Sequence, residues 1–235
     1  MILLIVRHGD PVYDPDSLTP LGHRQAEALA DRMAVNGLDE IYSSPLIRAQ
    51  QTAQPTADRL GIPVRIEDWM SENLAWREMA ADFPDGRHTW LFHQENTVYN
   101  TDEVAALGER WYEAPCFSLR DMKTAYQRIC DASDEFLARL GYVREERRYR
   151  IETPSEKRVA AFCHQGFGTT WLSWLLRVPP PVFWGSFDIT HSGVTVLEFQ
   201  NRPSGYTAPR CLCLSDTGHI FASGLPYKFE NRVPL

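Results

Sequence analysis

The 235-residue chain has a hydrophobic fraction of 43% and a formal net charge of −7, which are ordinary values for a globular enzyme. The acidic balance argues against a general nucleic-acid-binding protein, because such proteins normally carry a basic surplus. The apolar run at residues 2–6 is too short, and too soon followed by Arg7, for a signal peptide or a membrane span. We expect one domain over residues 1–235, with no nucleic-acid or membrane partner.

The five cysteines indicate neither a disulfide framework nor a metal site. Their number is odd, and Cys211 and Cys213 stand two apart, which is neither a CxxC nor a zinc spacing. Free cysteines are among the most often buried residue types, so we expect reduced, buried thiols and a cytoplasmic location. The chain also has no HExxH and no GxxxxGK[ST] motif, so we expect no metal and no cofactor.

The first nine residues, MILLIVRHG, are the most informative segment of the chain. Residues 2–6 are aliphatic without interruption, which is typical of a strand buried on both faces of a parallel sheet. Arg7 and His8 follow this strand directly, at the place where open parallel sheets carry their reactive groups, and Gly9 lets the chain turn tightly there. The segment therefore predicts a site where an anionic group meets a nucleophile.

A helix is predicted after the polar loop that follows the first strand. Thr19 suits an N-cap, and Pro20 suits the first helical position, where the missing N–H of proline does no harm. Apolar residues keep helical spacing from there to the stop signal at Asn36-Gly37.

A second strand and helix are predicted next. Residues 40–43 have the pattern of a short strand, and Ser44-Pro45 repeats the Thr-Pro device and is expected to start a further helix. Pro55 lies inside that helix and should kink or split it. Alternation of apolar and polar residues at 64–66 then predicts a third strand.

The segment from residue 69 to residue 123 is rich in aromatic side chains and shows no clean strand pattern. We interpret residues 73–123 as an insertion or cap on the substrate side of the site. Aromatic residues in such a segment belong more often to a core than to a ligand platform. Part of it is nevertheless a candidate lid.

The second half of the chain again pairs an apolar strand with a histidine. The strand at 159–163 runs straight into His164-Gln165-Gly166. The remaining elements are predicted as an amphipathic helix at 124–140, an exposed charged hairpin at 142–158, a helix at 169–177 that the prolines from Pro179 end, and late strands at 194–199 and 211–214. This succession indicates a three-layer α/β/α sandwich around a mostly parallel central sheet.

The chain offers a candidate for each part of a phosphoryl-transfer site. Such a site needs an aligned nucleophile, cations for the equatorial oxygens and a proton donor for the departing oxygen. His8 could attack through a neutral ring nitrogen if a backbone carbonyl held the other one. Arg7 and Arg48 could grip the phosphate by bidentate hydrogen bonds, and His164 could supply another charged donor. Gly166 would let the backbone approach closely there.

At these residues the chain resembles the histidine phosphatase superfamily, also called phosphoglycerate-mutase-like. Arg7-His8-Gly9 is similar to the RHG signature of that family. The wider matches are the T-x-x-G-x-x-Q-A segment at 19–26, the S-S-P-x-x-R-A-x-Q-T-A block at 43–53 and the second histidine segment at His164. The resemblance covers about the first 65 residues closely, and a further stretch near 159–176.

The resemblance implies that His8 is phosphorylated transiently, and that Arg7, Arg48 and His164 bind the phosphate. Gln165 stands where one branch of the family has its acidic proton donor, so that donor is absent, and we assign Gln165 to the substrate-binding residues.

The other branch uses a glutamate in the segment after the third strand, and Glu72 is our choice for this role. Its weaker rivals are Glu67, Asp68 and Glu78. For Glu72 to work near neutral pH its pKa must be raised by partial burial, which neighbouring tryptophans could provide.

Other charged or titratable residues are assigned no catalytic role. His23, His191 and His219 are expected to be structural, and Asp10 is expected either to line the pocket or to cap its loop. Candidate contacts to a second anionic group of the substrate are Arg77, Arg87, His88 and Arg110.

The leading functional prediction is a metal-independent phosphomonoesterase that acts on a small phosphorylated metabolite. One alternative is a phosphoglycerate mutase, which returns the phosphoryl group to a substrate hydroxyl. Another is a non-catalytic member that binds a phospho-ligand or a protein. The sequence leaves the substrate open, and a homodimer is an open possibility.

Overall fold

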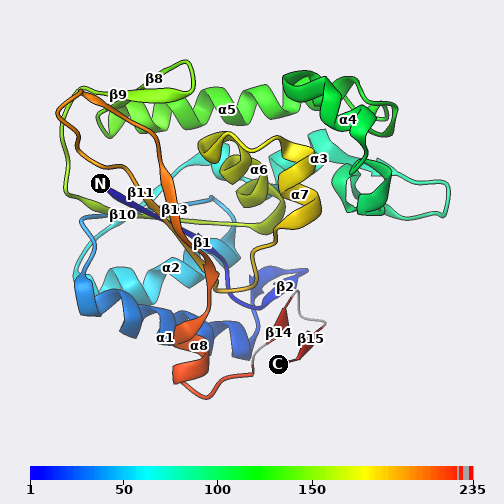
Figure 1. The fold of residues 1–235 in the computed structure, drawn as a ribbon. Helices are drawn as coiled ribbons and strands as arrows, with labels where there is room; N and C mark the ends of the chain where they lie inside the picture. Colours follow the sequence, from blue (N-terminus) through cyan, green and yellow to red (C-terminus); the bar gives the residue numbers. More distant parts are fainter. Residues whose placement is uncertain (227, 230–232, 235) are drawn as a thin grey trace.

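Six strands form a central sheet in the order β13-β11-β1-β10-β4-β5 (Figure 1). The computed structural model describes residues 1–226, 228–229 and 233–234. The strands of this sheet are β1 (Ile2–Arg7), β4 (Glu40–Ser43), β5 (Val64–Ile66), β10 (Arg158–Cys163), β11 (Val194–Glu198) and β13 (Arg210–Asp216). Strand β11 runs antiparallel to both its neighbours, while β1, β10, β4 and β5 are parallel to one another.

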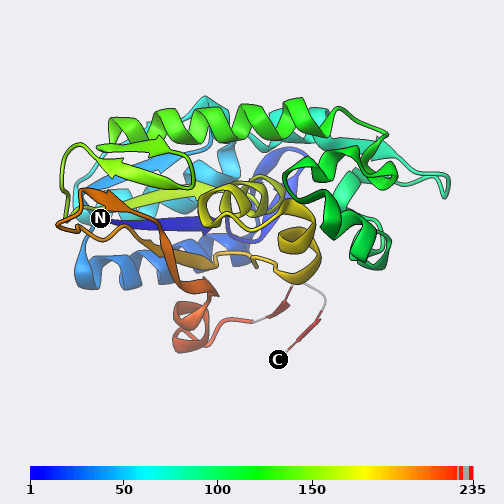
Figure 2. The same ribbon diagram turned by 45° about the horizontal axis from the view of Figure 1, so that its top comes forward.

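Helices cover both faces of this sheet (Figure 2), which confirms the predicted three-layer sandwich. Alternate side chains of a strand point to opposite faces. Leu3 and Ile5 of β1 therefore pack on the side of α5 (Met122–Arg139) and α6 (Gln165–Leu176), whereas Leu4 and Val6 pack on the side of α1 (Pro20–Asn36) and α2 (Ile47–Leu60). All four side chains are buried, as the uninterrupted apolar run predicts.

The first helix follows its predicted bounds, while the second differs. The Thr19 side chain accepts a hydrogen bond from the Gly22 N–H at the start of α1. Helix α2 begins at Ile47, because Ser44 and Pro45 lie outside the helix and the Ser44 hydroxyl accepts the Leu46 N–H instead. The helix also continues through Pro55 without a break, so Pro55 does not split it, while a kink at this residue stays a prediction.

Three further predictions on the second half need correction. Helix α6 begins at Gln165, four residues before the predicted start at Thr169, so its first turn lies beside His164. The prolines not only end α6 but also begin α7 (Pro180–Ser186), since a proline is tolerated in a first helical turn. The hairpin of β8 (Tyr142–Glu145) and β9 (Arg148–Ile151) is present, but its two tyrosines are fully buried.

The aromatic segment contains regular structure that its sequence does not show. Its first elements are α3 (Glu72–Met79) and the paired strands β6 (Ala80–Asp82) and β7 (His88–Trp90), so the prediction of no strand is wrong. The segment continues through η2 (Leu91–His93), η3 (Asn96–Val98), α4 (Asp102–Leu107), η4 (Gly108–Glu113) and η5 (Pro115–Phe117). It lies beyond the carboxyl ends of β1 and β10, away from the amino terminus (Figure 1). Its division from the rest of a single domain stays a prediction.

The remaining elements are short. They are β2 (Pro11–Tyr13), β3 (Asp16–Leu18), η1 (Asp68–Met70), β12 (Tyr206–Thr207), α8 (Gly218–Ala222), β14 (Lys228–Phe229) and β15 (Val233–Pro234). Cys130 and Cys163 are buried, whereas Cys211 is exposed, so the expectation of buried thiols holds only in part. Among the described residues, every helix is too short or too polar to cross a membrane.

Truncation of Leu29 tests the packing of α1 on the sheet. Leu29 is fully buried against the sheet, whereas Val35 on the same helix is 78% exposed. We expect Leu29→Ala to lower the free energy of unfolding by about 2–5 kcal/mol, because the cavity adds to the lost apolar burial. Val35→Ala should change it by less than about 0.5 kcal/mol. Urea unfolding followed by circular dichroism measures both, and equal effects would contradict this packing.

Candidate active site

The two histidines meet because their strands are adjacent and parallel. Arg7 at the end of β1 is in register with Cys163 at the end of β10, and the His8 N–H donates to the Cys163 carbonyl at 2.9 Å. The ring centroids of His8 and His164 are 5.2 Å apart. The carboxyl edge of the parallel strands thus carries the site, as the sequence predicts.

His8 is held as a neutral imidazole with one nitrogen available. Its Nδ1 donates to the Gly9 carbonyl at 2.7 Å, which leaves the Nε2 atom with a lone pair. The side chain is buried, and this burial, reinforced by His164, Arg7 and other positive neighbours, lowers the pKa of His8 well below its usual value. The ring also lines a cavity, so it can act as a nucleophile towards a group bound there.

Two buried guanidinium groups are fixed near the His8 ring. Arg7 donates through Nη1 to the Ile189 carbonyl at 2.6 Å and lies 2.7 Å through Nη2 from the Nε2 atom of His191. Arg48, in the first turn of α2, pairs with Asp16 at 2.6 Å. Both arginines line the same cavity as His8. Cations fixed in this way can bind an anion without losing side-chain freedom.

His164 contributes a buried nitrogen that faces the other site residues. Its Nε2 lies 2.7 Å from the Ser44 hydroxyl, and its Nδ1 lies 3.3 Å from a carboxylate oxygen of Glu72. This Nδ1 has no hydrogen-bond partner among the described residues. Burial, followed by the charges of Arg48 and Arg7, lowers the pKa of His164 well below its usual value. A neutral donor therefore fits this position better than the charged donor that the sequence suggested.

Glu72 reaches the site from the start of α3. Its Oε1 accepts the backbone N–H groups of Gly166 at 2.9 Å and Phe167 at 3.2 Å, in the first turn of α6. Its side chain is only 13% exposed, and burial raises its pKa above the usual value against the opposing effect of Arg48 and Arg7. A carboxyl group with a raised pKa is suited to donate a proton near neutral pH.

The rival carboxylates are engaged elsewhere. Glu67 pairs with Arg139, and Glu78 makes a two-pronged contact with Arg128. Neither of them lines the cavity, and Asp68 does not line it either. The structure therefore brings Glu72, and not its rivals, to His8.

Local sequence patterns do not identify two of the residues at the site. His191 was expected to be structural, yet it contacts Arg7 and its ring centroid lies 5.3 Å from that of His8. Asp16 anchors Arg48 and was not singled out. His191 precedes β11, and because β11 runs opposite to β1 its start lies at the carboxyl edge of the parallel strands. The sequence predicts that β11 is a strand, but it does not predict the direction in which this strand runs in the sheet.

Asp10 and Gln165 are both placed near the site. Asp10 accepts a hydrogen bond from Thr19 at 2.7 Å, so it caps the loop, and its other oxygen lies 3.6 Å from His191. Gln165 lines the cavity and donates to Asp188 at 2.8 Å.

The cavity at the site has a volume of about 1010 Å³. Beyond Arg7, His8, Arg48 and Glu72, its wall comes from the aromatic segment and from α7, together with Tyr13, Gln165 and Asp188. Of the four candidate contacts for a second anion, Arg87 and His88 line it, whereas Arg77 and Arg110 do not.

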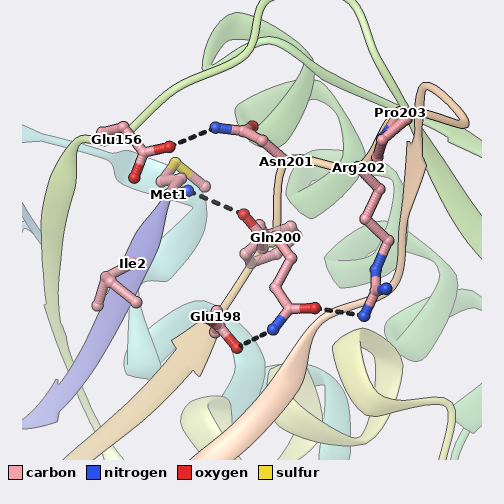
Figure 3. A pocket seen from close by; sticks show the side chains of 9 residues that line it. Met1, Ile2, Glu156, Glu198, Gln200, Asn201, Arg202 and Pro203 are labelled. Carbon is pink, nitrogen blue, oxygen red and sulfur yellow. Dashed lines mark hydrogen bonds between the residues drawn. The ribbon is translucent and has the colours of Figure 1, made fainter.

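A second cavity, of about 420 Å³, lies at the opposite end of β1. Figure 3 shows that its polar side chains bind one another: Gln200 donates to Glu198 at 2.8 Å and accepts from Arg202, and Asn201 donates to Glu156 at 2.6 Å. Its polar groups are thus engaged with one another.

Three side chains of the site could in principle ligate a metal ion. His8, Glu72 and His164 each offer one ligand atom, and these atoms lie within 4.8 Å of one another. The charges of Arg7 and Arg48 act on the same histidines, and two fixed cations oppose a third positive charge. The same arrangement favours an anion.

Comparison with known proteins agrees with this geometry. A sequence profile described as the histidine phosphatase superfamily (branch 1) matches residues 3–206. Because the match covers most of the chain, the protein belongs to this superfamily.

Curated relatives match over shorter segments. The chain is 34% identical over 97 residues to a Hydrogenobacter thermophilus protein that bears the name phosphoserine phosphatase, covering 37% of this chain and 45% of that one. It is 39% identical over 71 residues to a probable phosphoglycerate mutase of Yersinia enterocolitica, covering 26% of this chain and 33% of that one. The chain thus spans less than half the length of these two relatives.

Solved structures share the fold over nearly the whole chain. A phosphoserine phosphatase from Entamoeba histolytica in complex with 3-phosphoglyceric acid superposes with a TM-score of 0.61 and 21% identity, covering 93% of this chain and 98% of that one. A mycobacterial glucosyl-3-phosphoglycerate phosphatase gives 0.58 and 19%, covering 91% and 98%.

The buried neutral histidines predict a specific pH dependence of stability. The unfolded chain binds a proton on each histidine below about pH 6.5, while the folded chain resists it because the folded pKa is lowered. Stability should therefore fall as pH drops below about 6.5, by up to about 1.4 kcal/mol per pH unit for each histidine. His164→Asn should reduce this slope, whereas His23→Asn, at an exposed position on α1, should not. Urea unfolding between pH 7.5 and pH 5 measures the slopes, and an unchanged slope in His164→Asn would refute the assignment.

Proposed function

We propose that this protein is a metal-independent phosphatase of small phosphomonoesters that works through a phosphohistidine at His8. The single observation that carries the proposal is the buried His8 ring, whose Nδ1 is bonded to the Gly9 carbonyl, beside two fixed guanidinium groups at a cavity. A neutral nucleophile with cations around its target is the arrangement that phosphoryl transfer requires.

The reaction proceeds in two balanced steps. In the first, His8 Nε2 forms a bond to phosphorus while the bond from phosphorus to the leaving oxygen breaks, and protonated Glu72 gives its proton to that oxygen. In the second, a water oxygen attacks phosphorus, the His8–phosphorus bond breaks, and the Glu72 carboxylate takes a proton from the water. Inorganic phosphate leaves, and the enzyme returns to its starting state.

The remaining site residues stabilise the transferring group. Arg7, Arg48 and the His164 Nδ1 donate hydrogen bonds to the phosphoryl oxygens, and these interactions are stronger in a water-excluded site than in bulk solvent. His191 and Asp16 act through the arginines that they contact, by holding each guanidinium group in place. Gln165, fixed by Asp188, borders the same space and contacts the substrate.

A mutase is the second candidate, since relatives of the chain bear both kinds of name. A mutase must hold a bisphosphate without water, which calls for basic residues that close over the second anion. Arg87 and His88 are the candidates that line the cavity, yet each is paired with an aspartate and lies on an exposed hairpin. This pairing favours water as the acceptor. Conversion of 3-phosphoglycerate to 2-phosphoglycerate at a rate above its hydrolysis would instead favour the mutase.

Substitution of His8 tests the nucleophile. We expect His8→Asn to lower kcat for p-nitrophenyl phosphate by about 10⁴-fold or more, because no other side chain of the site can take the place of His8 as the nucleophile. The wild-type protein should keep its activity in EDTA and should carry acid-labile phosphate on His8 after rapid quenching. His23→Asn is the matched control and should keep full activity. Full activity of His8→Asn would overturn the proposal, and absent labelling with no turnover would favour the non-catalytic alternative.

Substitution of Glu72 tests the proton donor. Glu72→Gln should lower kcat/KM for phenyl phosphate by about 10²–10⁴-fold, and much less for p-nitrophenyl phosphate, whose leaving group needs little protonation. In the wild-type protein kcat/KM for phenyl phosphate should fall as pH rises through the raised pKa of Glu72, and the variant should lack this decrease. Glu78→Gln, at a carboxylate paired with Arg128, is the control. An equal loss with both substrates would contradict the role.

A further inference from the structure

One wall of the active-site cavity is a continuous row of aromatic rings, formed by Trp76 of α3, Trp90 and Phe92 at β7 and η2, and Trp184 of α7. Trp90 and Phe92 are stacked with centroids 5.2 Å apart, and Phe92 and Trp184 are stacked at 4.6 Å with an interplanar angle of 16°. Trp76 meets the Trp90 ring edge-on at 5.0 Å. Trp90 and Phe92 are buried, whereas Trp76 and Trp184 are half-buried, so the row offers the cavity an apolar surface that comes mainly from these two tryptophans.

One end of the aromatic row lies next to Glu72 and the first turn of α6. A Cβ atom on Gly166 would lie 2.5 Å from the Trp90 indole, so this ring rests directly on the first turn of α6. The N–H of the same Gly166 donates to Glu72, and Trp76 stands one helical turn after Glu72 on α3. A leaving group that takes its proton from Glu72 therefore lies alongside Trp76 and Trp90.

Two basic residues near this row, Arg87 and His88, are paired with neighbouring carboxylates. Arg87 Nε donates to Asp85 at 2.7 Å, and His88 Nδ1 lies 2.8 Å from Asp82. A carboxylate on the substrate would have to displace one of these partners, whereas a neutral ring would not. The cavity volume, at the upper end of the range for small-molecule sites, leaves room for a group much larger than serine or glycerate.

Building on the proposed phosphatase activity, we propose that the substrate is the phosphomonoester of an uncharged alcohol that carries an extended aromatic ring. The phosphate binds at His8, and the ring lies along Trp76 and Trp184. This class differs from phosphoserine and from phosphoglycerate, each of which carries a carboxylate and lacks an aromatic group.

The preference for a larger aromatic group can be measured with two substrates whose leaving oxygens are both phenolates. The wild-type chain should hydrolyse 2-naphthyl phosphate with a kcat/KM about tenfold above that for phenyl phosphate, because the second ring adds apolar contact while the leaving oxygen stays a phenolate. Phosphoserine and 3-phosphoglycerate should be poorer than both. Calorimetry with 2-naphthylmethylphosphonate and benzylphosphonate, which cannot be hydrolysed, should show a similar ratio of Kd values.

Variants of Trp76 test whether the aromatic row causes the preference for the naphthyl substrate. Trp76→Leu should lower the naphthyl-to-phenyl ratio about fivefold, and Trp76→Phe should retain most of it. Tyr206→Leu, at a half-buried aromatic residue outside the cavity lining, should leave the ratio unchanged.

The two assays separate this inference from the proposed function. Equal kcat/KM values for the two aryl phosphates with equal phosphonate binding, or an unchanged ratio in Trp76→Leu, would overturn the aromatic subsite while His8-dependent turnover stands. A naphthyl preference in phosphonate binding without turnover of any phosphate would support the subsite and refute the phosphatase.

Discussion

The parallel pairing of β1 with β10 is the constraint on which the site depends. The pairing continues one residue past the strands, through the hydrogen bond from His8 to the Cys163 carbonyl, and so fixes the two imidazoles 5.2 Å apart. Two buried rings this close to each other and to two guanidinium groups resist protonation, because each additional charge would lack solvent and meet like charge. The neutral His8 ring is thus a consequence of the fold, and neutrality is what its proposed role as nucleophile requires.

The remaining parts of the site are fixed from distant segments of the chain. Arg7 is held by the loop before β11, and Arg48 is held by Asp16 of the first hairpin. Glu72 is fixed by backbone N–H groups of α6. Each partner orients a charged side chain before any ligand binds, and this preorganisation is the main source of electrostatic stabilisation in enzyme sites. The arrangement concentrates positive charge in the protein interior, which a bound phosphate would neutralise.

The aromatic segment is coupled to this machinery at one backbone position. Gly166 lies between Glu72, which accepts its N–H, and the Trp90 ring, which occupies the space of a side chain. The wall of the cavity and the proposed proton donor therefore share a support. A segment without periodic sequence signals can still form a defined surface, because its rings pack on one another and on α7.

The sequence by itself determined the layers of the fold and four of the residues at the site. The apolar runs before His8 and His164 predict buried parallel strands, and such strands carry their reactive groups at the carboxyl edge, so these histidines and the neighbouring arginines could be found from local patterns. Glu72 required the family resemblance in addition. Only the tertiary structure brought His191 to Arg7, because the direction of β11 depends on long-range pairing. It alone also assembled the aromatic row, since contacts among irregular segments depend on packing and leave no periodic trace in the sequence.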